Sequence, residues 1–376
     1  MVFKDAKPVA PALRTPHHST PARFFCTILL MNNDLKNKTL EELEDMVDSF
    51  GQKKYLARYI FSFIHSKDTQ EISDITPLSK PFRTILAEKG CYISHLKTLS
   101  KLSDADQTVK YLFQLTDGVK IESVLMPDGK RKTLCVSTQA GCSRNCAFCA
   151  TARLKLVRNL TAAEIVDQVN LVQKEKGRIT NVVYMGMGEP LDNYDNVLKS
   201  VRILNHPQGK NIGLRRLTIS TCGNADAIKK LAGETIHPRL AVSLNAPTDQ
   251  LRSQIMPVNK KFPISPLMDA VKYYRLRTKL RVTLEYVLLS GLNDSQLCAH
   301  SLARLAQQAK CNINLIEYNP NQFCTFAPSG RKTIEKFARL LEDAGIETTV
   351  RFKRGGRINA ACGQLGADLI INPPEK

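Results

Sequence analysis

From about residue 105 onward, the spacing of apolar residues switches repeatedly between a period of two, typical of strands, and a period of 3.6, typical of helices. Short apolar runs predict strands at 134–138, 182–185, 217–220, 240–244, 282–289, 313–318 and 348–352. Helical spacing predicts helices near 161–176, 193–205, 223–232, 264–277, 294–309 and 330–343. This alternation indicates an α/β fold with a parallel sheet that helices cover.

The alternation amounts to about six strand–helix units, fewer than the eight that close a full barrel. We therefore expect a partial, open β/α barrel whose open side admits a large substrate. The pattern alone also fits an open doubly wound sheet, so that alternative stays open at this point.

In the segment before this region, residues 31–95, the spacing of apolar residues becomes helical from Thr39 onward. Thr39 and Glu42 form a capping box at the start of a helix that ends before Gly51, and a second amphipathic run covers 55–65. We expect a small all-helical accessory domain with a basic surface. Such a domain either packs against the catalytic part or grips RNA, and the sequence favours neither.

The other boundaries follow from changes in the pattern. Residues 1–30 are rich in proline and lack helical periodicity. We expect them to be a disordered extension, or a mis-assigned start that precedes a true first residue at Met31. We then expect a linker with a β-extension at 96–132, a catalytic domain at 133–366 and a C-terminal tail at 367–376.

Composition narrows the class of protein. Apolar residues make up 43% of the 376 residues, which excludes a mainly disordered chain. The longest apolar run, 24–31, is too short to span a membrane, because a span needs about 20 residues. Lys and Arg outnumber Asp and Glu by 54 to 35, giving a net charge of +19. We expect a polyanionic partner, with nucleic acid favoured over an anionic membrane surface.

The chain has 11 cysteines, an odd number in a sequence too long for a disulfide-stapled secreted scaffold. The apolar run at 24–31 lies too far from Met1 for a secretory signal, and no small-residue cleavage site follows it. We therefore expect a cytoplasmic protein whose cysteines are thiols, metal ligands or catalytic groups.

Three of these cysteines, Cys142, Cys146 and Cys149, lie within eight residues directly after a predicted strand. Structural zinc takes four protein ligands, and no fourth ligand lies nearby. Three thiolates can instead hold three irons of a [4Fe–4S] cluster and leave the fourth iron open. The spacing resembles the signature of radical S-adenosylmethionine (radical SAM) enzymes, in which the open iron binds the amino and carboxylate groups of that cofactor.

Two further segments carry candidate chemistry. Gly186 and Gly188 follow a predicted strand and allow the backbone to approach a ligand closely, and Glu189 follows them as a partner for an ammonium group. Cys362 lies in a glycine-rich loop after the last predicted strand. Nearby cations lower the pKa of a thiol, and four precede this one: Arg351, Lys353, Arg354 and Arg357.

Several motifs together resemble the RlmN/Cfr family of radical SAM enzymes, which methylate adenine in RNA. The likeness runs from about residue 31 to residue 366. It rests on motifs at 120–124, 134–142, 158–161, 186–190, 313–320 and 360–365.

The branch that this chain resembles more methylates C2 of an adenosine in the peptidyl-transferase region of 23S rRNA. Some of its members also modify the anticodon-loop adenosine of tRNA. Methylation at C8 of the same rRNA adenosine, as in the Cfr branch, remains an alternative. An alternative of another class is a non-catalytic RNA-binding protein with a structural metal.

The resemblance implies roles for specific residues. Cys362 would accept a methyl group from one S-adenosylmethionine, and the cluster would cleave a second to a radical that activates this methyl group. The activated carbon would then add to adenine, giving a covalent protein–RNA adduct. Glu122 would remove the ring proton, and Cys135 would attack Cys362 to free the RNA, leaving a Cys135–Cys362 disulfide.

By the same resemblance, several residues would contact S-adenosylmethionine: Gly188, Glu189, Ser220, Ser243, Leu244, Asn245 and Asn319. Family members usually have His where this chain has Asn245, and an amide cannot titrate as an imidazole does. The implied partners are 23S rRNA before or during ribosome assembly, tRNA, and an electron donor such as flavodoxin or ferredoxin. We expect a monomer that does not bind a membrane.

For two further groups of residues, the sequence does not indicate a specific function. The cations Arg275, Arg277, Lys279 and Arg281 form either a solvated helix end or a phosphate contact. The other cysteines show no ligand spacing and are interpreted as structural: Cys26, Cys91, Cys222, Cys298, Cys311 and Cys324.

Overall fold

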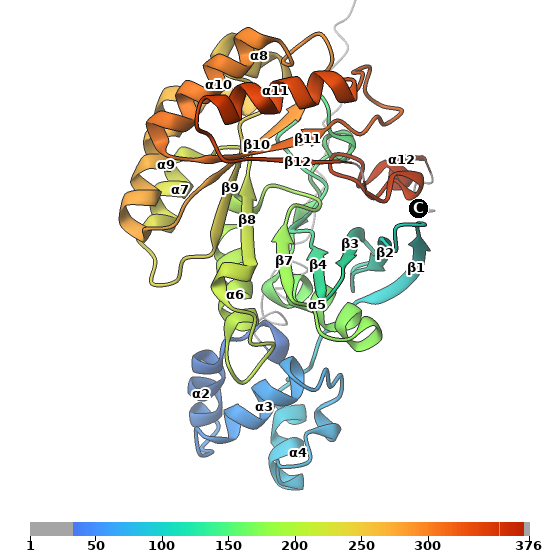
Figure 1. The fold of residues 1–376 in the computed structure, drawn as a ribbon. Coiled ribbons are helices and arrows are strands. Elements are labelled where there is room, and N and C mark those ends of the chain that lie inside the picture. The colour runs from blue at the N-terminus through green and yellow to red at the C-terminus, as the bar shows by residue number, and fades with distance from the viewer. Residues whose placement is uncertain (1–32, 353, 372–376) are drawn as a thin grey trace, which may run out of the picture.

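The computed structural model describes residues 33–352 and 354–371, arranged as a helical module below a large α/β body (Figure 1). The predictions for 1–30, for the tail beyond 371, and for Cys26 and Lys353 lie outside the described residues. Among the described residues, no helix is both long and apolar enough to cross a membrane.

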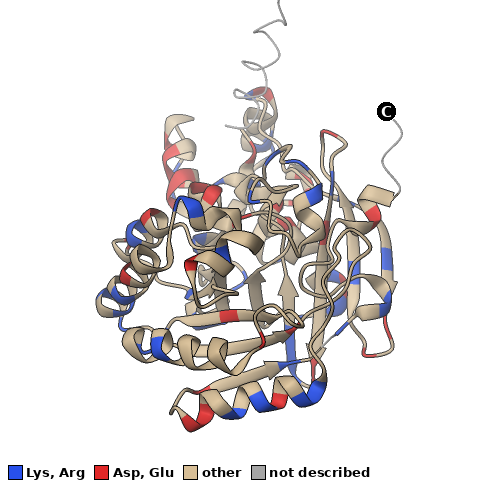
Figure 2. Cartoon of the chain, turned by 90° about the horizontal axis from the view of Figure 1, so that it is seen from above, with Lys and Arg blue, Asp and Glu red and all other residues tan. Residues whose placement is uncertain are grey.

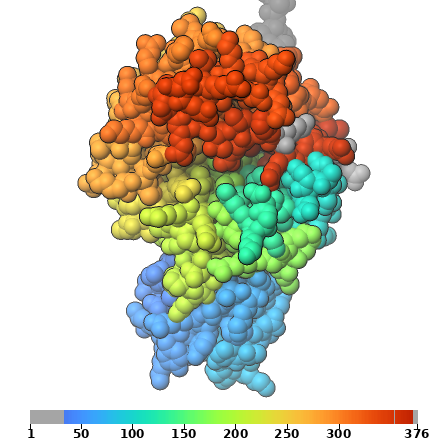
Figure 3. All heavy atoms as spheres, in the orientation of Figure 1, coloured from blue at the N-terminus to red at the C-terminus, as the bar shows by residue number. Residues whose placement is uncertain are grey.

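The helical module occupies the start of the described chain. Its elements are η1 (Leu35–Asn37), α2 (Leu40–Ser49), α3 (Leu56–His65), η2 (Ile72–Asp74) and α4 (Lys80–Glu88). The capping box forms as expected, since Thr39 N donates to Glu42 Oε2 at 2.8 Å and Glu42 N donates to Thr39 Oγ1 at 3.3 Å. Figure 3 shows the module as a lobe that packs against the barrel.

One ten-stranded sheet forms the centre of the α/β body, in the order β1-β2-β3-β4-β7-β8-β9-β10-β11-β12. The first four strands are antiparallel: β1 (Lys97–Ser103), β2 (Val109–Gln114), β3 (Lys120–Asp128) and β4 (Arg131–Cys135). From β4 onward neighbours are parallel: β7 (Asn181–Tyr184), β8 (Leu217–Thr221), β9 (Arg239–Ser243), β10 (Thr283–Leu288), β11 (Asn312–Glu317) and β12 (Thr348–Arg351).

Helices connect the parallel strands and cover the sheet (Figure 1). The main ones are α5 (Ala162–Lys176), α6 (Tyr194–Asn205), α7 (Ala225–Ala232), α9 (Ile264–Thr278), α10 (Gln296–Ala309) and α11 (Arg331–Asp343). Short elements complete the body: β5 (Gln139–Ala140), η3 (Ala150–Arg153), β6 (Arg158–Asn159), η4 (Pro190–Asp192), η5 (Leu214–Arg216), α8 (Asp249–Ile255), η6 (Pro257–Lys260), η7 (Gly356–Ile358) and α12 (Ala367–Ile371).

The strand order decides between the two expected architectures. A doubly wound sheet reverses its order at a switch point, whereas here each parallel strand lies beside the next one in the chain. The sheet does not close, because β1 and β12 are its two edges. The prediction of an open barrel with about six units is therefore confirmed, and the doubly wound alternative is excluded.

The strand predicted at 134–138 is the clearest difference from the sequence pattern. It ends at Cys135, because the next residues leave the β4 ladder and bond to the turn after β7. Thr138 N and Gln139 N both donate to Met187 O, at 2.9 and 3.1 Å. The apolar pattern continues past the strand because these loop residues are also buried.

A buried ion pair joins the helical module to the barrel. Lys36 Nζ lies 2.5 Å from Asp167 Oδ1 on α5, and the two side chains are 2% and 3% exposed. The other oxygen of Asp167 accepts from Leu96 N at 2.7 Å, just after the module. One carboxylate on the barrel therefore fixes both ends of the module.

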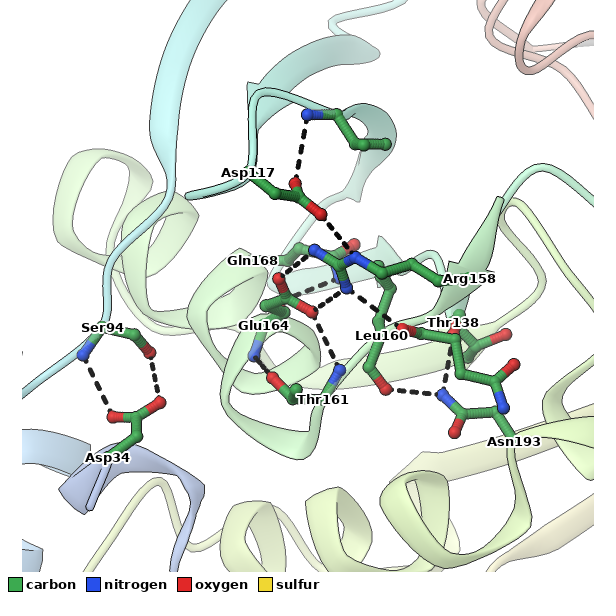
Figure 4. A network of polar contacts seen from close by, with 12 residues as sticks. Asp34, Ser94, Asp117, Thr138, Arg158, Leu160, Thr161, Glu164, Gln168 and Asn193 are labelled. Carbon is green, nitrogen blue, oxygen red and sulfur yellow. Dashed lines mark hydrogen bonds and ion pairs between the residues drawn. The ribbon is translucent and has the colours of Figure 1, made fainter. Parts of the chain in front are cut away.

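A second polar network lies beside this junction (Figure 4). Arg158 donates to both oxygens of Glu164 on α5, at 2.7 and 2.8 Å, and to Asp117 at 2.6 Å. Asp34 accepts from the backbone and hydroxyl of Ser94. The Arg158 contacts hold the start of α5 against the β2–β3 turn, and the Asp34–Ser94 bonds join the two ends of the helical module.

Asp167→Asn should destabilise the protein by about 3 kcal/mol, because it leaves the buried Lys36 ammonium without its counter-charge. Chemical denaturation of the two proteins measures the difference. Asp195→Asn is the matched control, since the Asp195–Lys230 pair is largely exposed and should contribute little. Equal unfolding midpoints for the two variants would contradict the assigned role of Asp167.

Candidate active site

The three closely spaced cysteines lie on a loop whose ends are held together by the paired strands β5 and β6. Within the loop, Cys142 N donates to Leu154 O at 3.1 Å. Near its end, Ala150 N donates to Gly363 O at 2.8 Å. This second bond attaches the cysteine loop to the segment that carries Cys362.

Cys142, Cys146 and Cys149 are partly exposed free thiols. Burial raises the pKa of all three, to about 12 for Cys142, and mutual repulsion raises the pKa of Cys146 further. Thiols this close together ionise readily only when a cation takes up their charge. The chemistry of this set therefore favours a positively charged metal centre.

The thiols do not form a site for a single ion. Among the described residues, no group of three His, Cys, Asp or Glu side chains converges on one metal position. A four-iron cluster needs no such point, because each thiolate binds a different iron. The three cysteines therefore fit a cluster better than a mononuclear metal.

A left-handed glycine shapes this loop. Gly141 has φ +79°, and a Cβ at this position would collide with the Lys155 carbonyl oxygen on the opposite side of the loop. Only glycine allows the two sides to approach this closely.

The turn after β7 packs against the β4–β5 loop. A Cβ on Gly186 would collide with the Val136 backbone, and one on Gly188 (φ +99°) with Gln139. The sequence suggested that these glycines admit a ligand. In the structure, the close approach that they allow is to the protein's own chain.

Glu189 ends this turn beside the cysteine loop and is 3% exposed. Its Oε1 accepts from Leu191 N at 3.1 Å, and its Oε2 accepts from Cys222 N at 2.7 Å. Burial raises the pKa of Glu189, and these bonds oppose the rise. The carboxylate also raises the pKa of Cys142 and Cys146, so it lies within electrostatic range of both.

Of the residues at the ends of β8 and β9, Ser220 and Ser243 are partly exposed, whereas Leu244 and Asn245 are buried. Asn245 has φ +57°. Its Oδ1 accepts from Val287 N at 2.9 Å, and its Nδ2 donates to the Met256 sulfur at 3.3 Å. The amide that replaces the usual histidine is thus used to attach the end of β9 to β10.

Asn319 lies two residues beyond β11 and is 3% exposed. Its Nδ2 donates to Glu317 O at 3.2 Å, whereas its Oδ1 is buried with no hydrogen-bond partner among the described residues. A buried acceptor without a donor is unfavourable by about 1–3 kcal/mol. It is the kind of group that a bound cofactor with N–H or O–H donors would satisfy.

The segment after β12 crosses from one edge of the sheet back to the antiparallel strands, where α12 lies beside β2 and β3 (Figure 1). Gly355 N donates to Asp106 Oδ2 at 3.0 Å, and Gly366 N donates to Glu122 Oε2 at 2.7 Å. Residues 354–371 therefore bridge the open side of the barrel, and Cys362 lies on this bridge.

Cys362 is exposed to solvent, although enough protein surrounds its thiol to desolvate it in part. Burial and the Glu285 carboxylate raise the pKa of its thiol, and Arg351 opposes them. The expectation of a lowered pKa is therefore wrong. One reason is that Arg354 is directed elsewhere, to Pro127 O at 3.0 Å and Asp128 at 3.7 Å.

The strand register places Cys135 and Glu122 on one face of the sheet. Cys135 pairs with Val124 on β3, and Glu122 lies two residues from Val124. Glu122 is 2% exposed, and its Oε1 lies 3.2 Å from Lys110 Nζ on β2. Burial raises the pKa of Glu122, and Lys110 and the Gly366 N–H oppose the rise.

Cys135 lies close to Cys362 from the barrel side. It is buried, which raises the pKa of its thiol, and a Cys362 thiolate raises it further. Cys149 in turn contributes to the raised pKa of Cys362. The structure thus brings Cys135, Cys362 and Cys149 within electrostatic range. All ten cysteines in the described part are free thiols.

Comparison with known proteins extends these observations. The model of the radical SAM superfamily matches residues 136–303, and that of the ribosomal RNA large subunit methyltransferase N-terminal domain matches residues 33–92.

Two relatives, from Geotalea uraniireducens and Geobacter sulfurreducens, are named dual-specificity RNA methyltransferase RlmN. They are 43% and 42% identical to this chain, over 89% and 91% of its length and 97% and 94% of theirs. The chain belongs to the RlmN family.

A solved structure agrees with this assignment. A radical SAM methyltransferase from Sphaerobacter thermophilus superposes with a TM-score of 0.84 at 43% identity, over 89% of this chain and 99% of the other. Radical SAM enzymes use a [4Fe–4S] cluster and S-adenosylmethionine, and these are the cofactors of the RlmN family. The three thiols and the free Asn319 Oδ1 fit this pair of groups.

The sequence did not single out several residues around the site of this RlmN family member. Lys110, which contacts Glu122, lies in a segment predicted only as a β-extension. Cys222 and Cys324 were interpreted as structural, yet Cys222 lies within electrostatic range of Cys146, and Cys324 within that of Cys149. No spacing signal could have found them, because they come from different β/α units.

Gly141→Ala should impair iron loading, because the added Cβ must displace the Lys155 carbonyl and residue 141 must keep a left-handed backbone. We expect less than half of the iron and of the cluster absorbance of the unmodified protein after anaerobic reconstitution. Gly213→Ala is the control, since no atom lies within 4 Å of a Cβ there and its φ is −58°. Normal iron content in Gly141→Ala would show that the loop tolerates a side chain.

Proposed function

We propose that this chain methylates C2 of an adenosine in the peptidyl-transferase region of 23S rRNA, and the anticodon-loop adenosine of tRNA. Two observations support this. The chain spans 97% of a relative that is named a dual-specificity RNA methyltransferase, and its net charge of +19 suits an RNA substrate. We further propose that it acts in the cytoplasm as a monomer and takes electrons from a donor such as flavodoxin or ferredoxin.

The observation that carries this proposal is the position of Cys362. Its thiol lies within electrostatic range of Cys149 on one side and of Cys135 on the other. It is also open to solvent, unlike the buried Cys135. A thiol that first receives a methyl group and later forms a disulfide needs both neighbours and this access.

In this proposal Cys142, Cys146 and Cys149 hold the cluster. When bound, the cluster and S-adenosylmethionine supply the methyl group and the radical chemistry that activates it. The chain contributes the acceptor, Cys362, and holds it on the bridge that Gly363 O attaches to the cysteine loop.

The remaining contacts to S-adenosylmethionine would come from the ends of the parallel strands. On this proposal the residues are Gly188, Glu189, Ser220, Ser243, Leu244, Asn245 and Asn319. Glu189 already accepts two backbone N–H groups, so an ammonium group would share its carboxylate. Among these residues, Asn319 has a buried side-chain oxygen, Oδ1, that accepts no hydrogen bond from the described residues.

Glu122 and Cys135 would complete the reaction once the adenine is attached to Cys362. Glu122 accepts the ring proton, which requires its carboxylate to be ionised. The one electron left over from the radical addition would pass to the bound cluster. Cys135 then attacks the Cys362 sulfur. An S–S bond forms, the S–C bond breaks, and the carbon leaves with the electron pair and takes up a proton as the new methyl group.

Methylation at C8 would use the same thiols and the same base. The names of the relatives favour C2. A non-catalytic RNA-binding role is disfavoured by family membership and by the grouping of Glu122, Cys135 and Cys362 in one site.

Cys135→Ala should trap a covalent protein–RNA adduct, because no thiol remains to break the bond between Cys362 and the RNA. The adduct would migrate slowly on a denaturing gel after reaction with an rRNA fragment and S-adenosylmethionine. Cys362→Ala should form none, since it lacks the methyl acceptor. Cys311→Ala, which changes a buried thiol far from the site, should behave as the unmodified protein. Adduct formation by Cys362→Ala would refute the roles assigned to these two cysteines.

The pH dependence of adduct resolution tests Glu122. Its pKa is already raised by burial, and Lys110 opposes the rise. Lys110→Met removes this cation and should raise the pKa of Glu122 further. As the solution is acidified, Glu122 should then become protonated, and adduct resolution should stop, at a higher pH than in the unmodified protein. Single-turnover decay of the adduct against pH measures the shift. Lys101→Met, which removes an exposed partner of Glu175, is the control. Superimposable profiles would contradict the role of Glu122 as the base.

A further inference from the structure

Lys and Arg are spread over helices and strands on several sides of the molecule (Figure 2). The total charge therefore does not mark a path for RNA by itself. At one place in the described part of the chain, several cations surround a hollow. This hollow has a volume of about 620 Å³ and is lined by Arg275, Lys279, Arg281, Lys310, Cys311 and Glu347, among others. We name it the basic groove.

The basic groove lies at the amino ends of the last three strands. Arg281, Cys311 and Glu347 come just before β10, β11 and β12, and Lys279 and Lys310 directly follow α9 and α10. The candidate active site is at the opposite, carboxyl ends of these strands. Because β10 has six residues, the two ends are separated by about 20 Å.

The charges in the basic groove are not balanced within the described part of the chain. Glu347 is the one carboxylate among its lining residues, and it pairs with Arg281. Arg275, Lys279 and Lys310 have no carboxylate within ion-pair distance among the described residues, and the Arg275 Nε is buried without a hydrogen-bond partner there. A buried N–H donor of this kind is available to an acceptor from outside the chain.

The helix dipole is the ordinary explanation for cations at such positions. Cations stabilise a helix C-terminus, and this accounts for Arg275 in the last turn of α9. The helix dipole does not explain why the two lysines have an unusual backbone conformation. Lys279 (φ +60°) and Lys310 (φ +53°) occupy the left-handed region, where a residue other than Gly, Asn or Asp costs about 1–2 kcal/mol. Lysine side chains are thus present where the backbone favours glycine.

An anion with several charges and many acceptor oxygens fits this set of donors. The distance from the cysteine loop distinguishes the possible partners. An acidic electron-donating protein would have to approach the cluster, at the other end of the strands. An RNA that places a base in the active site continues for many nucleotides, and one duplex strand covers about 20 Å in roughly six of them, at about 3.4 Å each.

We propose that the basic groove binds the phosphodiester backbone of the RNA substrate at a point remote from the methylated base. This proposal rests on the proposed function, because it assumes that RNA is the substrate. It assigns to the amino end of the barrel a role in RNA capture, separate from the chemistry at the carboxyl end.

The double variant Lys279→Asn/Lys310→Asn tests the proposal. Asparagine removes both charges and tolerates the left-handed backbone, so the fold should be kept. The control is Lys332→Gln/Lys336→Gln on α11, which removes the same charge from exposed positions that do not line the groove. Binding of the anaerobically reconstituted full chain to a transcript of the peptidyl-transferase region is followed by fluorescence anisotropy at several salt concentrations.

We expect the slope of log affinity against log salt to fall by about 1 for each lysine removed from the groove, and to change much less in the control. An unchanged slope would overturn the proposal, whether or not the groove then proves to bind an acidic protein. Methylation of the same transcript by the unmodified protein is measured alongside. If that methylation is absent, the proposed function fails. If it is present and the slope is unchanged, only the basic groove is refuted.

Discussion

The arrangement of the site depends on one buried carboxylate. Glu122 on β3 accepts from Gly366 N and contacts Lys110 on β2, so it links the antiparallel end of the sheet to the segment after β12. An open barrel leaves its two edge strands apart, and this carboxylate is the buried charged group that attaches the chain after the last strand to the other side of the opening. Because Lys110 also pairs with Asp368, the attachment has a second point nearby.

This attachment gives the bridge two properties at once. Its C-terminal part is held by the buried Lys110 and Glu122, and its start by the exposed Asp106, whereas Cys362 between them is open to solvent. On the other side, Gly363 O accepts from Ala150 N, and Asn321 Nδ2 lies 3.5 Å from the same oxygen. The Cys362 thiol is thereby held within electrostatic range of the cysteine loop and of β4 without being buried in the core. Such a position suits the role that we propose for it as the methyl acceptor.

The raised pKa values in the site have a common cause. Burial disfavours the ionised forms of Glu122, Cys135 and the cysteine-loop thiols. Specific neighbours oppose the rise: Lys110 and the Gly366 N–H for Glu122, and a backbone hydrogen bond with Met185 for Cys135. Shifted pKa values of this kind are common at functional sites.

The sequence by itself determined the order of the elements and the chemistry of the cysteine loop. The apolar period predicted the strands and helices from β4 onward, because each is long enough to show its own repeat. The spacing of Cys142, Cys146 and Cys149 is also local, so it could be read directly. Tertiary structure decided what depends on strand register and on chain crossings. Three pairings join segments that are far apart in the chain: Lys110 with Glu122, Cys135 with Cys362, and Lys310 with the cations at 275–281 in the basic groove. The cations near Cys362 in the sequence predicted a lowered pKa for its thiol, and this prediction is wrong for the same reason. Arg354 is directed to β3 instead. Burial, which a local sequence pattern does not report, raises the pKa of the thiol.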